Sequence, residues 1–124
     1  MVLDETTPRP ETPTLVEKEW GREYILADKP NYGCKILVVE AGQRTSLQRH
    51  FKRDETWFFL SGTAWVTIEG REFTATAEDL VHVPVGLLHR IEGITEVRLV
   101  EAVPRYVPGD IERIEDDYGR AGGK

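Results

Sequence analysis

The sequence has little cysteine and no long apolar segment, and each shortage excludes a class of protein. Cys34 is the only cysteine, so no disulfide can form within the chain, and a reducing, cytoplasmic location is expected. No apolar run approaches the roughly 20 residues that a membrane helix needs, and the N-terminus lacks the apolar core of a signal peptide. We therefore expect a cytoplasmic protein with no membrane partner.

Positive charge is also scarce. Sixteen lysines and arginines stand against 22 acidic residues, which gives a formal net charge of −6. A nucleic-acid surface needs an excess of positive charge, so we expect no nucleic-acid partner. At 124 residues, the chain is long enough for one domain with a core and too short for two.

Short β-strands are what the sequence does contain. Runs of Val, Ile, Thr and aromatic residues alternate with turn residues at short intervals, a pattern typical of an all-β sandwich or jelly roll. No long amphipathic helix is predicted. The expected strands lie near residues 22–27, 32–40, 44–50, 54–60, 63–69, 71–76, 79–83, 88–92 and 96–103.

The two ends of the chain differ from this pattern. Residues 1–14 hold three prolines, which predicts a flexible N-terminal arm or, alternatively, an arm that pairs with a second subunit. The folded domain is expected over residues 15–118, within which residues 110–118 form a short helical or extended piece. Residues 119–124 read GRAGGK and are expected to be a flexible C-terminal tail.

Two of the three histidines fall on one pattern of possible metal ligands. The chain reads G-x5-Q-x-H-x4-E-x6-G from Gly42 to Gly62, and P-x-G-x-x-H begins 22 residues later. Side chains two residues apart on a strand share one face. Nitrogen and oxygen ligands of this kind suit Zn²⁺, with Mn²⁺, Co²⁺, Ni²⁺ and Fe²⁺ as competitors. The candidate metal ligands are Gln48, His50, Glu55 and His89.

The same period-2 rule predicts which neighbours of the ligands face inward. It places Arg44 and Ser46 on the inner face with the first ligands, and Trp57 and Phe59 on the inner face with Glu55. The third histidine, His82, is interpreted as a hydrogen-bonded structural residue. A metal held by one carboxylate keeps about one unit of positive charge, which polarises a substrate carbonyl or hydroxyl.

The two motifs resemble the pair that defines the cupin superfamily, whose fold is all-β, a double-stranded β-helix or jelly-roll barrel. Gln48 stands where the first histidine is usual, and Glu78 and Gly93 replace the Gly and Asn of the second motif. Further matching residues are Trp20-Gly21, Glu23-Tyr24, Ser46-Leu47-Gln48, Arg53, Glu55, Trp57, Ser61-Gly62 and the IEDDYGR of residues 114–120. Together they resemble the type II mannose-6-phosphate isomerase domain, which is often fused behind a mannose-1-phosphate guanylyltransferase domain.

This resemblance implies a metal-dependent isomerase that interconverts mannose 6-phosphate and fructose 6-phosphate through an enediolate. Glu101 and Lys35 match acid or base positions of the family and are the expected catalytic proton shuttles. Arginine binds phosphate through paired hydrogen bonds, and Arg113 and Arg120 in the terminal motif are expected to close over the site or pair with nearby acids. The expected substrate-binding residues are Arg44, Ser46, Arg53 and Arg90.

The chain departs from the family at three histidines, which are replaced by Phe51, Lys52 and Thr56. These changes are expected to lie beside the metal site and to alter the substrate or abolish turnover. One alternative is therefore a cupin that binds a metal and senses a sugar or another small molecule. Another is a structural or interaction module, whereas dioxygenase chemistry is disfavoured because Gln48 replaces a histidine. A homodimer that pairs sheet edges is expected, helped by outward apolar residues such as Leu47.

Overall fold

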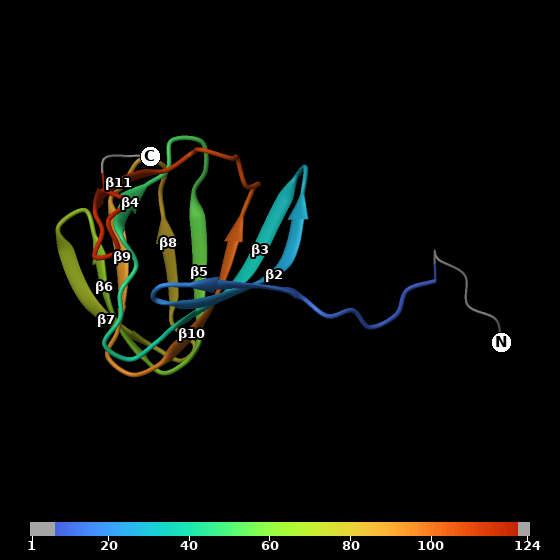
Figure 1. Ribbon diagram of the computed structural model, residues 1–124, viewed down its shortest axis with the longest axis horizontal. Coiled ribbons are helices and arrows are strands. Elements are labelled where there is room, and N and C mark those ends of the chain that lie inside the picture. The colour runs from blue at the N-terminus through green and yellow to red at the C-terminus, as the bar shows by residue number, and fades with distance from the viewer. Residues whose placement is uncertain (1–6, 122–124) are drawn as a thin grey trace.

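The computed structural model describes residues 7–121, which form two facing antiparallel β-sheets (Figure 1). The larger sheet has the strand order β1-β2-β3-β10-β5-β8. Its strands are β1 Thr14–Lys18, β2 Gly21–Lys29, β3 Tyr32–Val39, β10 Val97–Val103, β5 Glu55–Ser61 and β8 Leu80–Val83. The smaller sheet, in the order β11-β4-β9-β6-β7, comprises β11 Glu112–Glu115, β4 Leu47–Arg49, β9 His89–Gly93, β6 Thr63–Ile68 and β7 Arg71–Thr76. The predicted all-β jelly roll is confirmed.

Every strand expected from the sequence has a counterpart, although one is much shorter. The strand expected over residues 44–50 is regular only at β4, and Arg44 forms an isolated bridge with Glu92. Strand β1 was not predicted, and β11 lies within residues 110–118, where a short helical or extended piece was expected. Within the described residues no helix forms, and so none that could span a membrane.

The N-terminal arm and the C-terminal tail are described only in part. Residues 8–13 are exposed and run away from the sheets as extended chain (Figure 1). Residues 1–6 of the predicted arm and 122–124 of the predicted tail lie outside the described residues.

The core lies between the two sheets and follows the alternation of their strands. Trp57 and Phe59 of β5 are 1% and 0% exposed, which confirms that they face inward. They pack in one apolar cluster with Leu99 of β10, Val66 of β6 and Ile91 of β9. Each such side chain contributes about 1.5–3 kcal/mol by leaving water. The interior also contains buried polar residues, among them His50, Glu55, His89 and Glu101.

The turn from β5 into β6 requires a glycine. Gly62 has a φ of 81°, and a Cβ atom there would lie 1.9 Å from the carbonyl oxygen of Glu96. A side chain would therefore force this turn away from the segment that leads into β10. The closing glycine of the first motif thus helps to hold β5, which carries Glu55, against β10.

Candidate metal centre and its cavity

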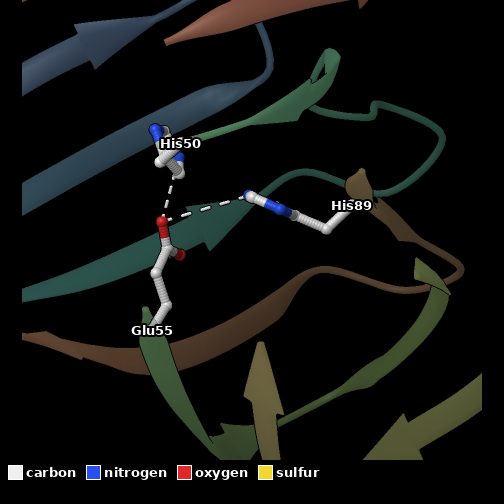
Figure 2. A group of neighbouring side chains, drawn as sticks. All are labelled: His50, Glu55 and His89. Carbon is white, nitrogen blue, oxygen red and sulfur yellow. Dashed lines mark ion pairs between the residues drawn. The ribbon is translucent and has the colours of Figure 1, made fainter. Parts of the chain in front are cut away.

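His50, Glu55 and His89 converge in the interior between the sheets (Figure 2). His50 directly follows β4, while Glu55 and His89 are the first residues of β5 and β9. Nε2 of His50 lies 2.9 Å from Oε2 of Glu55, and Nε2 of His89 lies 4.0 Å from the same oxygen. All three side chains are buried, and their ligand atoms lie within 4.8 Å of one another. The structure therefore brings together three of the four predicted ligands.

Backbone carbonyls orient both imidazoles. Nδ1 of His50 lies 2.6 Å from the carbonyl oxygen of Asp110, and Nδ1 of His89 lies 3.0 Å from that of Leu87. Because a carbonyl only accepts, each Nδ1 carries a proton. Ligand histidines in metalloproteins are held by outer contacts of the same kind.

The Nε2 atom of His89 is the clearest sign of a missing ligand partner. It is buried and has no hydrogen-bond partner among the described residues. Burial lowers the pKa of His89, so the ring is neutral and the lone pair is free. Leaving such an atom unsatisfied costs about 1–3 kcal/mol, and a divalent ion bound there would remove that cost. The three residues thus fit a metal.

Glu55 supplies the negative charge of the centre. Burial raises its pKa, but hydrogen bonds with His50 and Glu101 and the nearby positive charge of Arg53 outweigh burial and hold the pKa well below its usual range. Its Oε1 accepts a hydrogen bond from the indole of Trp57 at 2.9 Å, and its Oε2 accepts two from Arg53 at 3.1 and 2.9 Å. A terminal nitrogen of Arg53 also lies 3.1 Å from Nε2 of His50.

Gln48 lies next to this centre but is already engaged. It pairs in register with His89 across β4 and β9. Its Oε1 accepts a hydrogen bond from the hydroxyl of Ser46 at 2.7 Å. Both side chains line the same cavity as His50, and the role of Gln48 as a fourth ligand stays a prediction.

A cavity of about 200 Å³ opens beside the centre and carries more positive than negative groups. Its acidic lining residues are Glu23, Glu101 and Asp110. Its basic lining residues are Lys18, Lys35, Arg53, Arg113 and Arg120. The predicted residues Lys35, Ser46, Gln48, Arg53 and Glu101 all share it.

Glu101 is the buried acid of this cavity. It pairs in register with Lys35 on β3 and Trp57 on β5. Burial, the negative charge of Glu55 and a hydrogen bond with Glu55 raise the pKa of Glu101 well above its usual value. The pKa values of these two neighbouring carboxyl groups are thus shifted in opposite directions, which is the arrangement that separates acid and base roles in enzymes.

Tyr106, which the sequence analysis missed, holds Glu101 in place. Its hydroxyl donates to Oε2 of Glu101 at 3.0 Å, and its ring lies 4.3 Å from Nζ of Lys35 and 5.0 Å from the guanidinium carbon of Arg53. A Cβ atom on Gly33 would lie 2.4 Å from this ring. A glycine inside a strand often marks a place where another group approaches the backbone closely. Gly33 was therefore the one signal in the sequence that a bulky side chain packs against β3.

The expected inward orientation of Arg44 is wrong, and Arg90 also lies outside the cavity. Both line a separate hollow on the other side of the smaller sheet, where Arg44 pairs with Asp117 at 2.7 Å and Arg90 with Glu115 at 3.5 Å. The period-2 rule fails for Arg44 because residues 42–46 do not form a regular strand. For Arg90 the rule itself predicts an outward position, since its neighbour His89 points inward.

The three residues that replace family histidines do not face the cavity either. Phe51 and Lys52 are exposed, and Thr56 lies on the opposite face of β5 from Glu55 and Trp57. None of the three lines the cavity, so the expectation that these changes lie beside the metal site is wrong for their side chains.

The C-terminal motif contributes Arg120 to the cavity lining. Asp116 pairs with Arg120 at 2.8 Å, as expected, and Tyr118 donates to Oε1 of Gln43 at 2.8 Å. The hydrogen bond to Gln43 and the pair between Asp117 and Arg44 tie the terminal segment to the stretch that leads into β4. They leave Arg120 at the cavity wall.

Comparison with known proteins agrees with this geometry. Residues 8–116 match the family described as mannose-6-phosphate isomerase C-terminal. The chain belongs to this family. It is 30% identical over 109 residues to a mannose-1-phosphate guanylyltransferase of Klebsiella pneumoniae, and 34% identical over 109 residues to the alginate biosynthesis protein AlgA of Pseudomonas aeruginosa. Each match covers 85% of this chain and 23% of the relative, so this mannose-6-phosphate isomerase-type domain spans about a quarter of their length.

Solved structures share the fold. The nucleoside dehydratase Pac13 of Streptomyces has a TM-score of 0.76 at 16% identity, covering 88% of this chain and 93% of that chain. The capsular polysaccharide assembling protein CapF of Staphylococcus aureus has a TM-score of 0.74 at 18% identity, covering 83% and 34%. The cupin domain of Schizosaccharomyces pombe Cnp3 has a TM-score of 0.63 at 19% identity, covering 68% and 64%. At these identities the likeness shows the cupin fold alone.

Proposed function

We propose that this domain is a metal-dependent sugar-phosphate isomerase that interconverts mannose 6-phosphate and fructose 6-phosphate through an enediolate. The observation that carries the proposal is the buried His50, Glu55 and His89 group, which lies beside Glu101, a carboxyl of raised pKa, in a cavity lined by cations. Membership of the mannose-6-phosphate isomerase C-terminal family supports the same reaction.

His50, Glu55 and His89 would hold the metal, with Gln48 as the proposed fourth ligand. Two imidazoles, one carboxylate and an amide oxygen favour Zn²⁺ over Mn²⁺, Co²⁺, Ni²⁺ and Fe²⁺. A divalent ion bound there would polarise the sugar carbonyl and stabilise the negative oxygen of the enediolate.

Glu101 is the proposed carrier of the proton that moves between C1 and C2. Its raised pKa makes the ionised carboxylate a strong base, able to take the proton from one carbon and return it to the other. Tyr106 keeps the carboxyl oriented through its hydrogen bond. Lys35, whose Nζ lies 3.2 Å from Oε1 of Glu23, is the proposed partner for the proton that passes between the two sugar oxygens.

The phosphate group is proposed to bind the cations of the cavity. Arg53 stands beside the centre, while Arg113 and Arg120 line the cavity from the C-terminal segment. Arginine pairs with phosphate through two parallel hydrogen bonds. Arg44 and Arg90, which belong to the other hollow, are left with a structural role in anchoring the terminal motif.

A second candidate is a metal-binding cupin that binds the sugar phosphate without converting it. The contact that favours it is that of Arg53, whose guanidinium lies 2.9 Å from Glu55 and 3.1 Å from His50. This cation competes with a metal for the same two ligand atoms and would weaken metal binding.

One experiment separates the two candidates. The protein is loaded with one equivalent of Zn²⁺, Mn²⁺ or Co²⁺ and incubated with mannose 6-phosphate in D₂O, and proton NMR follows product and deuterium at C2. Fructose 6-phosphate formed by the wild type but not by Glu101→Gln supports the isomerase. Binding of mannose 6-phosphate without product, in protein shown to hold metal, rejects the isomerase and supports the second candidate.

A further inference from the structure

A second hollow, of about 320 Å³, lies on the outer face of the smaller sheet. Strand β6 alternates between the two faces of this sheet. Ala64 and Val66 are buried in the core, so Trp65 and Thr67 face outward and line the hollow. Among the described residues, the hollow and the cavity beside the metal centre share no lining residue. A ligand in the hollow would therefore leave the metal centre accessible.

Trp65 gives the hollow a flat apolar surface. Its side chain is half-buried, but it belongs neither to the core cluster nor to the side chains packed against that cluster. Within residues 7–121, no second aromatic ring or cation stacks on its ring, and its indole nitrogen has no hydrogen-bond partner. Tryptophan combines a large apolar face with one hydrogen-bond donor at its edge. Both remain available to a ligand here.

Two unengaged carboxylates flank this ring. Glu92 is the registered partner of Trp65 across β9 and β6, and Glu72 is the registered partner of Thr67 across β7 and β6. Side chains that are directly opposite each other have Cβ atoms about 4.5–5.5 Å apart. In the part of the chain that the structure describes, neither carboxylate takes part in a hydrogen bond or an ion pair. Their oxygens can therefore accept hydrogen bonds from a ligand that lies on the indole.

The charges of the hollow favour a cation over an anion. Its lining holds two arginines and three glutamates. Both arginines are already paired, since Arg44 lies 2.7 Å from Asp117 and Arg90 lies 3.5 Å from Glu115. The cavity beside the metal centre has the opposite balance, with five basic and three acidic lining residues. A phosphate group is therefore attracted to that cavity and repelled by the hollow.

A pyranose sugar has the chemistry that this arrangement can bind. The C–H groups of its ring pack flat on an aromatic face, and its hydroxyls donate to carboxylate oxygens at the edge of that face. An amino group on the sugar would add a charge-assisted hydrogen bond to a carboxylate and a cation–π contact with the indole. We propose that the hollow is a second carbohydrate site, which binds a pyranose without phosphate and prefers an amino sugar to a neutral one. The proposal does not depend on the isomerase activity.

Proton–nitrogen NMR on the full chain tests the proposal, with protonated glucosamine, glucose and mannose 6-phosphate as probes. The three tryptophans give three indole signals, and Trp65→Phe identifies that of Trp65. Glucosamine should shift this signal in a saturable way and at lower concentration than glucose, while mannose 6-phosphate should leave it unmoved. The indole of Trp57 donates to Glu55 at 2.9 Å, so its signal separately reports binding beside the metal centre.

Three variants then test the groups involved. Trp65→Ala should weaken glucosamine binding at least tenfold, followed through the backbone amides of Thr67 and Glu92. Because Trp65 lies outside the core cluster, this variant should keep the dispersed spectrum of a folded protein. Glu92→Gln keeps the shape of the side chain without its charge, and should reduce the preference for glucosamine over glucose. Glu40→Gln changes an exposed acid outside the hollow and is the matched control, which should bind both sugars as the wild type does.

Four results would each overturn the proposal. They are the absence of a saturable shift of the Trp65 signal with either sugar, a preference for glucose over glucosamine, a Trp65→Ala variant that binds glucosamine as tightly as the wild type, and binding of mannose 6-phosphate in the hollow as tight as that of glucose.

Discussion

Replacing His89 by phenylalanine should separate the stability of the protein from its affinity for metal. The Nε2 atom of His89 is buried without a partner, while Nδ1 donates to the carbonyl of Leu87 at 3.0 Å. The ring lies edge-on to Trp57, with ring centres 5.6 Å apart. Phenylalanine keeps a flat ring in this position but has neither nitrogen.

The two lost polar groups have opposite effects on the metal-free protein. Removing an unsatisfied buried nitrogen gains about 1–3 kcal/mol, and losing one neutral hydrogen bond costs about 0.5–1.5 kcal/mol. The metal-free His89→Phe variant should therefore be about 1 kcal/mol more stable than wild type, which raises Tm by roughly 3–5 °C for a domain of this size.

Adding metal should make the wild type more stable than the His89→Phe variant. A ligand at 100 times its Kd stabilises the folded state by about 2.7 kcal/mol, or roughly 10 °C in Tm. Wild type should gain this on adding Zn²⁺, and His89→Phe should gain almost nothing. Differential scanning calorimetry with and without chelator measures both effects.

The matched control is His82→Ala, which removes the exposed third histidine and should leave the Zn²⁺ response unchanged. A His89→Phe protein that still binds one equivalent of zinc with the wild-type rise in Tm would refute the role of His89 as a ligand. If the metal-free His89→Phe variant is destabilised by more than about 2 kcal/mol, then the unpaired Nε2 of His89 does not destabilise the metal-free wild type.

Three further predictions concern the surroundings of the centre. Because the pKa of Glu101 is raised on folding, the folded state holds its proton longer and this group lowers stability as pH rises above the usual value of 4.5. Glu101→Gln should thus be more stable than wild type at pH 8, by an amount that shrinks toward pH 4.5 in urea titrations, and should isomerise at least about 100-fold more slowly; a variant less stable at pH 8 would contradict the shift. Asp110→Ala removes the carboxylate that accepts hydrogen bonds from the backbone amides of Phe51 and Lys52 at 2.8 and 3.0 Å. Because these bonds help to position His50, the variant should bind zinc about 10- to 100-fold more weakly. Unchanged affinity in calorimetric titration would show that His50 is positioned without them. Gly33→Ala should cost about 1–3 kcal/mol in urea unfolding by displacing the ring of Tyr106, and a loss below 0.5 kcal/mol would mean that the ring moves freely.

The strands that sequence reasoning found are those whose own residues carry a signal. β5 and β10 alternate core and surface residues, and their turns contain glycine. β11 reads ERIE, a charged tetrad whose pairing with β4 comes from tertiary contacts rather than from its composition. β1 is similarly short and depends on β2 for its hydrogen bonds. Such strands cannot be recognised from a periodic pattern.

The site was predictable as far as its residues follow regular backbone. His50, Glu55 and His89 were found because spacing alone places ligands at strand ends. Arg44 was misplaced because alternation does not extend through an irregular segment. Tyr106 was missed because it follows a strand in a loop, and only the ring's demand on Gly33 connects it to the cavity.

The replaced histidines weaken the isomerase proposal less than the sequence suggests. Phe51 and Lys52 lie in a loop whose amides are held by Asp110, and Thr56 faces the outer side of β5. None of them removes a ligand, an acid or a cation from the cavity. The groups on which the proposed chemistry depends are retained. These three departures from the family pattern therefore concern the surface of the domain, while the interior keeps the residues on which the proposed isomerase chemistry depends.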